Sequence, residues 1–277
     1  MVPAALYPLP NATAATAVLL VAAAGLALPV YLLFYRPIGS DRIWGLAEIG
    51  AISILFMLTL PMAFALAGVA EPLTLTDFSA ATLAQNGLFV ILSVYVVAVR
   101  YRLDLGRLGL RVAAWPRHAA LGALVAGLTV PMAMAAEEMA VFAFGLVEGP
   151  ARAAARAAAE HLDDPLLPLL SAVGGPVEAA WFLALLVVVV PVGEEVFFRG
   201  FVYGALRARW GVPVAAATSA LFFTAVHLQV VHALPIFLLG LVLAVLYERT
   251  GTLLPAVIAH AVNNVVAVVA MWRGWGW

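Results

Sequence analysis

Long apolar runs, separated by short segments that hold most of the charged residues, dominate the pattern of the chain. A helix needs about 20 apolar residues to cross the hydrocarbon core of a bilayer. Runs of that kind predict eight membrane-spanning helices, at residues 12–35, 43–70, 84–100, 119–146, 177–208, 212–229, 233–249 and 253–272. The pattern therefore predicts an all-α, polytopic membrane protein.

The composition supports this fold class. Of 277 residues, 65% are hydrophobic and only 10% are charged, and the mean hydropathy is +1.08, whereas a soluble domain carries about 25% charged residues. These values exclude an ordinary soluble globule, a disordered chain and a nucleic-acid-binding protein. The chain has no cysteine, which excludes disulfides, thiolate metal sites and a cysteine nucleophile.

The arginines predict the orientation of the spans. With the N-terminus outside, the inner loops hold most of them, at positions 36, 42, 100, 102, 107, 111, 117, 207, 209 and 249. The outer segments hold only Arg152, Arg156 and Arg273. Such asymmetry is what the positive-inside rule expects, and it predicts a multi-pass protein of the cell membrane with both termini outside.

The chain divides into two predicted parts. Residues 1–118 hold the first three spans and a basic inner loop, and residues 119–277 hold spans four to eight. In the connection 147–176, the Ala/Arg-rich segment Ala151–Glu160 predicts a short helix. This connection is either a lid over a cavity or an interfacial linker, and the linker is the favoured interpretation.

Ionisable side chains within spans cost at least ~2.5–3.5 kcal/mol each on insertion scales, so they are functional candidates by default. In this chain the candidates fall on the fifth, sixth and eighth spans. They are Glu194, Glu195 and Arg199, then His227 with Phe223 on the same helical face, and then His260 with Asn264. Glu137 and Glu138, on the fourth span, either line the same cavity or are solvated at its outer end. The loop residues His118, His161 and His232 are given no role.

Helical spacing sorts these residues. Glu195 and Arg199 are four positions apart and can form an ion pair on one face, whereas Glu194 points about 100° away and stays available for chemistry. If the chain folds back at Trp210–Gly211, Glu194 and His227 lie roughly 22 Å and 24 Å from that turn, at nearly the same depth.

The same spacing places His260 and Asn264 on one face of the eighth span. His260 fits the common depth less well, because it lies roughly 14 Å from the inner end of its helix. A tilt, or a kink at Pro255, could bring it level with the other candidates.

These side chains suit amide hydrolysis by activated water. A carboxylate and an imidazole in a dry cavity form a general-base site, and a second imidazole and an amide can donate hydrogen bonds to an oxyanion. The sequence has no G-x-S-x-G elbow, H-E-x-x-H zinc signature, P-loop or Rossmann glycine pattern.

The combined motifs carry a family resemblance. Glu194-Glu195-x-x-x-Arg199, Phe223-x-x-x-His227 and His260-x-x-x-Asn264, in this order on separate spans, resemble the three motifs of the CAAX-processing and bacteriocin-processing (CPBP, or ABI) intramembrane proteases, which include the type II CAAX prenyl endopeptidases. The matching core runs from about Pro191 to Val268.

The resemblance implies an eight-helix fold with a cavity inside the membrane and a role for each motif residue. Glu194 and His227 would activate water. His260 and Asn264 would stabilise the oxyanion. Glu195 and Arg199 would support the site. The partners it implies are membrane lipid and a peptide or membrane-protein substrate.

Metal dependence stays open at this point. The family is often described as metalloproteases, and Glu194, His227 and His260 offer the ligand types that bind zinc. A metal-free glutamate mechanism is also proposed for relatives, so we expect no obligatory cofactor, with a divalent metal such as zinc as the alternative.

Two other classes of function compete with the protease. One is a non-catalytic immunity or scaffold protein that keeps the fold. The other is a transporter with Glu194 and Glu195 as an ion relay, although such proteins often contain inverted repeats, and no repeat is visible here.

Overall fold

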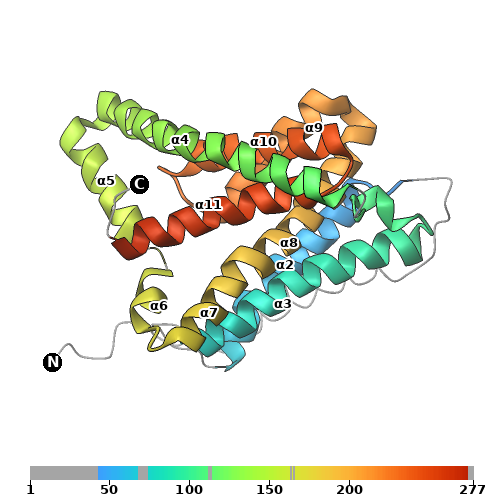
Figure 1. Ribbon diagram of the computed structural model, residues 1–277, viewed down its shortest axis with the longest axis horizontal. Coiled ribbons are helices and arrows are strands. Elements are labelled where there is room, and N and C mark those ends of the chain that lie inside the picture. The colour runs from blue at the N-terminus through green and yellow to red at the C-terminus, as the bar shows by residue number, and fades with distance from the viewer. Residues whose placement is uncertain (1–42, 68–73, 112–113, 163, 165, 274–277) are drawn as a thin grey trace, which may run out of the picture.

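The computed structural model describes residues 43–67, 74–111, 114–162, 164 and 166–273, which are largely helical and contain no strand (Figure 1). The elements are α2 (Leu46–Ala67), α3 (Leu75–Val94), η1 (Tyr95–Arg100), η2 (Leu105–Leu108), α4 (Trp115–Glu148), α5 (Pro150–Leu162), α6 (Leu166–Ala172), α7 (Pro176–Ala184), η3 (Leu185–Val189), α8 (Val190–Glu195), η4 (Val196–Tyr203), α9 (Gly204–His227), α10 (Ala233–Thr250) and α11 (Leu254–Arg273). The all-α prediction is confirmed for these residues.

Five stretches of the described residues are long and apolar enough to cross a membrane. They are Leu75–Arg100, Trp115–Glu148, Pro176–His227, Ala233–Thr250 and Leu254–Arg273, and a shorter apolar stretch, Leu46–Met57, lies in α2. The protein is therefore a multi-pass membrane protein. The predicted span 12–35 lies outside the described residues, so the number of eight crossings stays a prediction.

The predicted fifth and sixth spans form one continuous helical run that turns at Gly211. Its φ of 76° and ψ of 173° are not helical, and this φ lies in the region that favours glycine. Beyond the turn, the Ser219 hydroxyl donates to the Phe198 carbonyl at 3.0 Å. The second half of α9 therefore packs back on η4, as the fold-back at Trp210–Gly211 predicted.

The third predicted span begins nine residues earlier than expected, at Leu75 rather than at residue 84. Thr74 and Asp77 form a capping box, in which each side chain accepts a hydrogen bond from the other residue's backbone N–H, at 3.1 and 3.2 Å. Such a box satisfies the first N–H groups of a helix. The polar first turns of α3 are therefore helical although they are not apolar.

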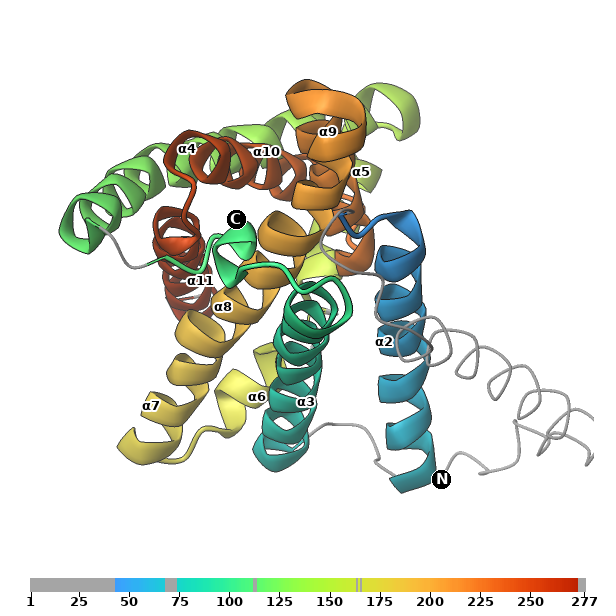
Figure 2. The same cartoon turned by 90° about the vertical axis from the view of Figure 1, so that its right-hand side faces the viewer.

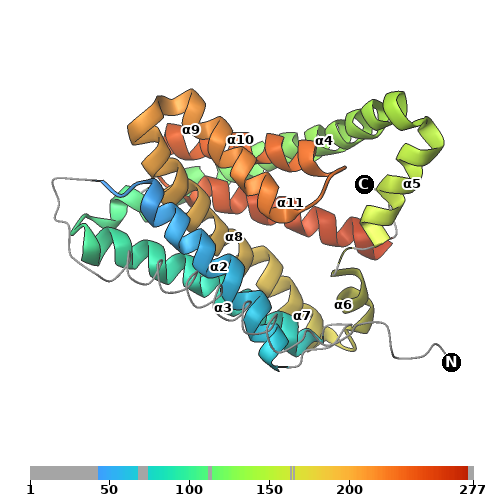
Figure 3. The ribbon, with the colours of Figure 1, turned by 180° about the vertical axis from the view of Figure 1, so that it is seen from behind.

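The helices form two groups. In Figures 1 and 3, α2, α3 and the run from α7 through α8 lie roughly alongside one another, and α4, α10 and α11 form a second group stacked on them. Figure 2, turned by 90°, shows α4 and α10 at the top, above α2, α3 and α7, with α11 close to α8. Helix α11 contacts both α4 and α8, so residues of the eighth predicted span lie next to those of the fifth.

Aromatic side chains join the N-terminal helices to η4. The Trp44 indole N–H donates to the Phe201 carbonyl at 2.8 Å, and the Phe89 ring of α3 stacks on Phe197 with centroids 4.3 Å apart. Such ring pairs contribute about 0.5–1.5 kcal/mol each beyond their buried area. The motif-bearing run is thus held from one side by α3.

Candidate active site

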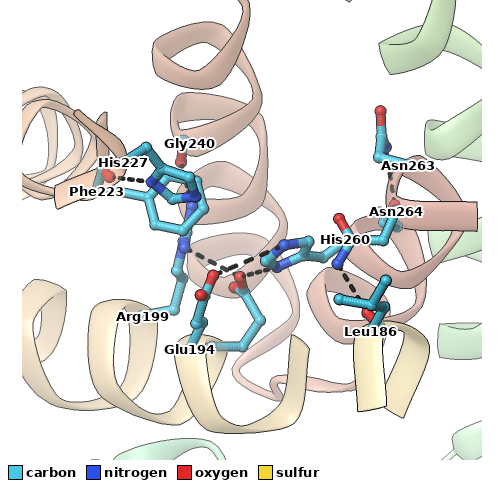
Figure 4. Close-up of polar contacts among 11 residues, drawn as sticks. Leu186, Glu194, Arg199, Phe223, His227, Gly240, His260, Asn263 and Asn264 are labelled. Atoms are coloured by element: carbon cyan, nitrogen blue, oxygen red, sulfur yellow. Dashed lines mark hydrogen bonds and ion pairs between the residues drawn. The ribbon is translucent and has the colours of Figure 1, made fainter. Parts of the chain in front are cut away.

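Two opposite charges are buried together beside the aromatic core. Glu195 and Arg199 are fully buried, and Nη1 of Arg199 donates to Oε1 of Glu195 at 3.0 Å. Nη2 donates to the Gly240 carbonyl at 3.3 Å, and the guanidinium lies 4.3 Å from the centroid of the Phe223 ring (Figure 4). The ion pair predicted from the four-residue spacing is confirmed.

Glu195 also holds His260, which the spacing rules did not indicate. Nδ1 of His260 lies 3.0 Å from Oε1 of Glu195, the same oxygen that accepts from Arg199. An ionised carboxylate can only accept hydrogen bonds, so Nδ1 carries the proton. The His260 ring is therefore fixed with Nε2 directed to the other side.

Glu194 lies on that other side. Nε2 of His260 is 3.8 Å from Oε2 of Glu194 (Figure 4). The Glu194 side chain is buried, and its Oε2 has no hydrogen-bond partner among the described residues. The depth mismatch expected for His260 is thus absent, because α11 lies against α8.

His227 ends α9 and completes the group from the opposite side. Its Nδ1 lies 2.6 Å from the Phe223 carbonyl, and its ring packs edge-on against the Phe223 ring with centroids 4.6 Å apart. A carbonyl oxygen only accepts, so Nδ1 is the donor and Nε2 is left as an acceptor. Phe223 therefore orients the imidazole as a potential base.

Glu194 and His227 line one small cavity. Its volume is about 150 Å³, and its remaining lining residues are Phe56, Gln85, Phe89, Phe198 and Val226. One water needs only about 15 Å³ of such volume. The cavity therefore has room for a water between an acid and an imidazole, in largely aromatic surroundings.

A wider pocket meets His227 from outside this cavity. It has a volume of about 740 Å³ and is lined by α5 and the turn 227–230, together with Glu148 and Asp164. Because His227 borders both spaces, a substrate in the wider pocket would reach the site at this residue. The connection predicted as a linker or a lid thus forms a wall of this pocket through α5.

Asn264 does not join Glu194 and His227 in the small cavity. Its Nδ2 donates to the Leu186 carbonyl at 2.8 Å (Figure 4), and its side chain lines a different pocket, of about 190 Å³, between α4, α10 and α11. One of its two amide N–H groups is therefore engaged by the backbone of η3.

A second polar cluster surrounds His232, which the sequence assigned no role. The Glu160 carboxylate of α5 accepts from the backbone N–H groups of residues 230–232 and lies 2.8 Å from Nδ1 of His232. Burial alone would raise the pKa of Glu160, but these hydrogen bonds lower it overall. Nε2 of His232 lies 3.6 Å from buried Glu137.

The two acidic residues of α4 do not share one environment. Glu137 is buried and lines the 190 Å³ pocket, while Glu138 is exposed. Neither residue lines the cavity of Glu194 and His227. The cluster attaches α5 to the turn that follows His227.

Helix α3 approaches α8 closely at Gly193, the residue before Glu194. A Cβ atom at Gly193 would overlap the Asn86 side chain. Asn86 is buried, and its Nδ2 donates to the Thr82 carbonyl at 2.9 Å. No motif rule reveals this contact, because it joins two helices that are far apart in the chain.

The candidate ligands do not form a metal-binding set in this arrangement. Among the described residues, no three His, Asp or Glu side chains converge as the ligands of one ion would. Nδ1 of both site histidines is engaged, by Phe223 for His227 and by Glu195 for His260, so only Nε2 of each ring could bind an ion. Because no three such ligands converge among the described residues, no step is assigned to a metal.

Comparisons with known proteins point to a peptidase family. Residues 176–266 match the family model described as type II CAAX prenyl endopeptidase Rce1-like, and this segment contains all seven predicted site residues. A Bacillus subtilis (strain 168) protein named "Putative membrane peptidase YdiL" is 32% identical over 82 residues, which cover 30% of this chain and 34% of that protein. The chain thus spans about a third of that relative's length. No solved structure matches the chain.

Proposed function

We propose that this chain, which belongs to the type II CAAX prenyl endopeptidase Rce1-like family through residues 176–266, is a membrane-embedded endopeptidase. Its substrate would be a peptide or the tail of a membrane protein. The observation that carries the proposal is the single cavity shared by Glu194 and His227.

The proposed reaction consumes one water. The Glu194 carboxylate accepts a proton from the water, while Nε2 of His227 accepts a hydrogen bond from its other O–H. The water oxygen bonds to the carbonyl carbon, and the π electrons move onto the carbonyl oxygen. When the intermediate collapses, the C–N bond breaks, its electron pair stays on nitrogen, and Glu194 returns the proton to that nitrogen.

His260 is the proposed first donor to the oxyanion. As an imidazolium it would donate from Nδ1 to Glu195, where the ring is already held, and from Nε2 to the developing oxygen charge. Glu195 and Arg199 then act as positioning residues. One N–H of the Asn264 amide donates to the Leu186 carbonyl and the second is left to donate. Asn264 does not line the cavity of Glu194 and His227, so its role as an oxyanion donor stays a prediction.

The wider framework of the proposal follows the sequence. It comprises eight crossings in the cell membrane, both termini outside, and water activation without an obligatory metal. A zinc-dependent reaction is the alternative, which predicts that a chelator abolishes hydrolysis and that added zinc restores it.

The test is hydrolysis of a peptide library by the purified protein in liposomes, read by mass spectrometry. Glu194→Gln and His227→Ala should each abolish cleavage without lowering the melting temperature by more than a few degrees. Glu138→Gln is the matched control, because this carboxylate is exposed and away from the cavity, and it should retain cleavage. Full activity in both site variants refutes the proposal.

A further inference from the structure

A residue with a carboxamide side chain, from the N-terminal half of the chain, lines the cavity of Glu194 and His227. Gln85, on α3, is a lining residue of this cavity and is half-buried. It lies outside the segment 176–266 that the family model matches. The family match therefore assigns nothing to it.

The acid and the base of the cavity do not include a neutral hydrogen-bond donor. The polar lining residues of the cavity are Glu194, His227 and Gln85, and the others are apolar. The Glu194 carboxylate and Nε2 of His227 both act as acceptors toward water. His260, the first donor proposed above, does not line this cavity. A donor within the cavity could bind the oxygen of a scissile carbonyl beside it, and the Gln85 side chain carries two N–H groups that can serve.

The Gln85 amide is also uncommitted within the described part of the chain. No hydrogen bond joins its side chain to another described residue, in contrast to Asn264, whose Nδ2 donates to the Leu186 carbonyl. The neutral donor that lines the cavity of Glu194 and His227 is thus on α3, whereas Asn264, the donor predicted from the motif on α11, lines a different pocket.

The contacts of α3 with η4 and α8 fix which face of α3 is turned toward the cavity. Phe89 is four residues after Gln85, so the two share a helix face, and both line the cavity. The Phe89 ring is stacked on Phe197 at 4.3 Å, and Asn86 lies against Gly193 on the adjacent face. These contacts hold α3 in rotation and along its axis, which places Gln85 in the cavity that Glu194 lines.

We propose that Gln85 is a catalytic residue that donates a hydrogen bond from Nε2 to the oxygen of the scissile carbonyl. This inference rests on the proposed function. The bond strengthens as the oxygen becomes an oxyanion, so its contribution falls on kcat rather than on KM. Loss of one such donor typically lowers kcat by about 10²–10³-fold.

The experiment measures kcat and KM of Gln85→Met, which keeps the length of the side chain and removes both donors. We expect kcat to fall by about 10²–10³-fold with KM changed much less. Gln85→Asn keeps the amide but draws it back by one carbon, so its kcat should lie between those of the wild type and Gln85→Met. Leu83→Met, at an exposed position of α3 outside this cavity, should match the wild type.

The outcomes separate this inference from the proposed function. If the wild type cleaves peptides, Glu194→Gln does not, and folded Gln85→Met retains the wild-type kcat, Gln85 is not catalytic and the proposed function stands. If Gln85→Met melts lower than the wild type, the kcat of a folded Gln85→Asn decides, and a wild-type value overturns the role. If the wild type cleaves nothing, both proposals fall.

Discussion

Removal of the Arg199 charge should destabilise the protein far more than removal of a surface arginine. In Arg199→Met, the Glu195 carboxylate would stay fully buried without its cation. Breaking a buried pair from one side costs about 3–5 kcal/mol, because an uncompensated charge remains. Since about 1.4 kcal/mol is a tenfold change, the unfolding equilibrium constant should rise by about 10²-fold to 4 × 10³-fold.

Arg207→Met is the matched control. Arg207 is bound to Glu248 by two bonds of 2.6 and 2.7 Å, shorter than the Arg199 contact, but half of its side chain is exposed. Exposed pairs contribute only about 0–1 kcal/mol. The two variants should therefore differ in their loss of unfolding free energy because one ion pair is buried and the other is exposed, and not because of the contact distances.

The assay is equilibrium unfolding in mixed micelles, followed by tryptophan fluorescence. The double variant Glu195→Gln/Arg199→Met should be more stable than Arg199→Met alone, because no unpaired charge remains in it. Equal, small losses in Arg199→Met and Arg207→Met would contradict this reasoning. So would a double variant whose loss equals the sum of the two single losses.

Two further predictions concern neighbouring contacts. Gly193→Ala should lower the unfolding free energy by about 1–3 kcal/mol and reduce cleavage, because the new methyl group overlaps Asn86. In the same melting and cleavage assays, Gly87→Ala should change neither quantity, because no atom lies near the position of its new methyl group. Hydrogen bonds from backbone amides and from His232 hold the pKa of Glu160 below its ordinary value. The contribution of Glu160 to the stability of the turn after α9 is therefore full at neutral pH, and it is lost as the pH falls through the folded-state pKa. Hydrogen exchange in the turn after α9 should therefore speed up as the pH falls, after correction for intrinsic rates, and Glu160→Gln should remove this dependence; a dependence unchanged in the variant would contradict the assignment.

The sequence predicted the class of the fold because hydrophobic runs report directly on burial in lipid. It also predicted the turn at Gly211, since the flanking Arg207 and Arg209 mark the end of a span. It placed the start of α3 wrongly at residue 84, because a capping box satisfies polar first turns that an apolarity criterion rejects. Hydropathy measures where a helix meets lipid, whereas hydrogen bonding decides where the helix begins.

In the site, contacts within one helical run could be predicted from the sequence, whereas contacts between residues far apart in the chain could not. The Glu195–Arg199 pair was predictable because both partners lie on one helical run, where four-residue spacing fixes their distance. The contact from Glu195 to His260 was not, because 65 positions separate the two residues.

A sequence motif predicts which residues of its own helices belong to a site. The packing of the other helices determines which side chains surround those residues. Asn264 follows the motif spacing, yet it lines a different pocket from Glu194 and His227. Gln85 belongs to no motif, yet the contact of α3 with α8 at Gly193 places it in the cavity. If packing contacts of this kind determine which residue donates to the oxyanion, the acid and the base can lie in the motif-bearing segment while the donor lies on a helix outside it.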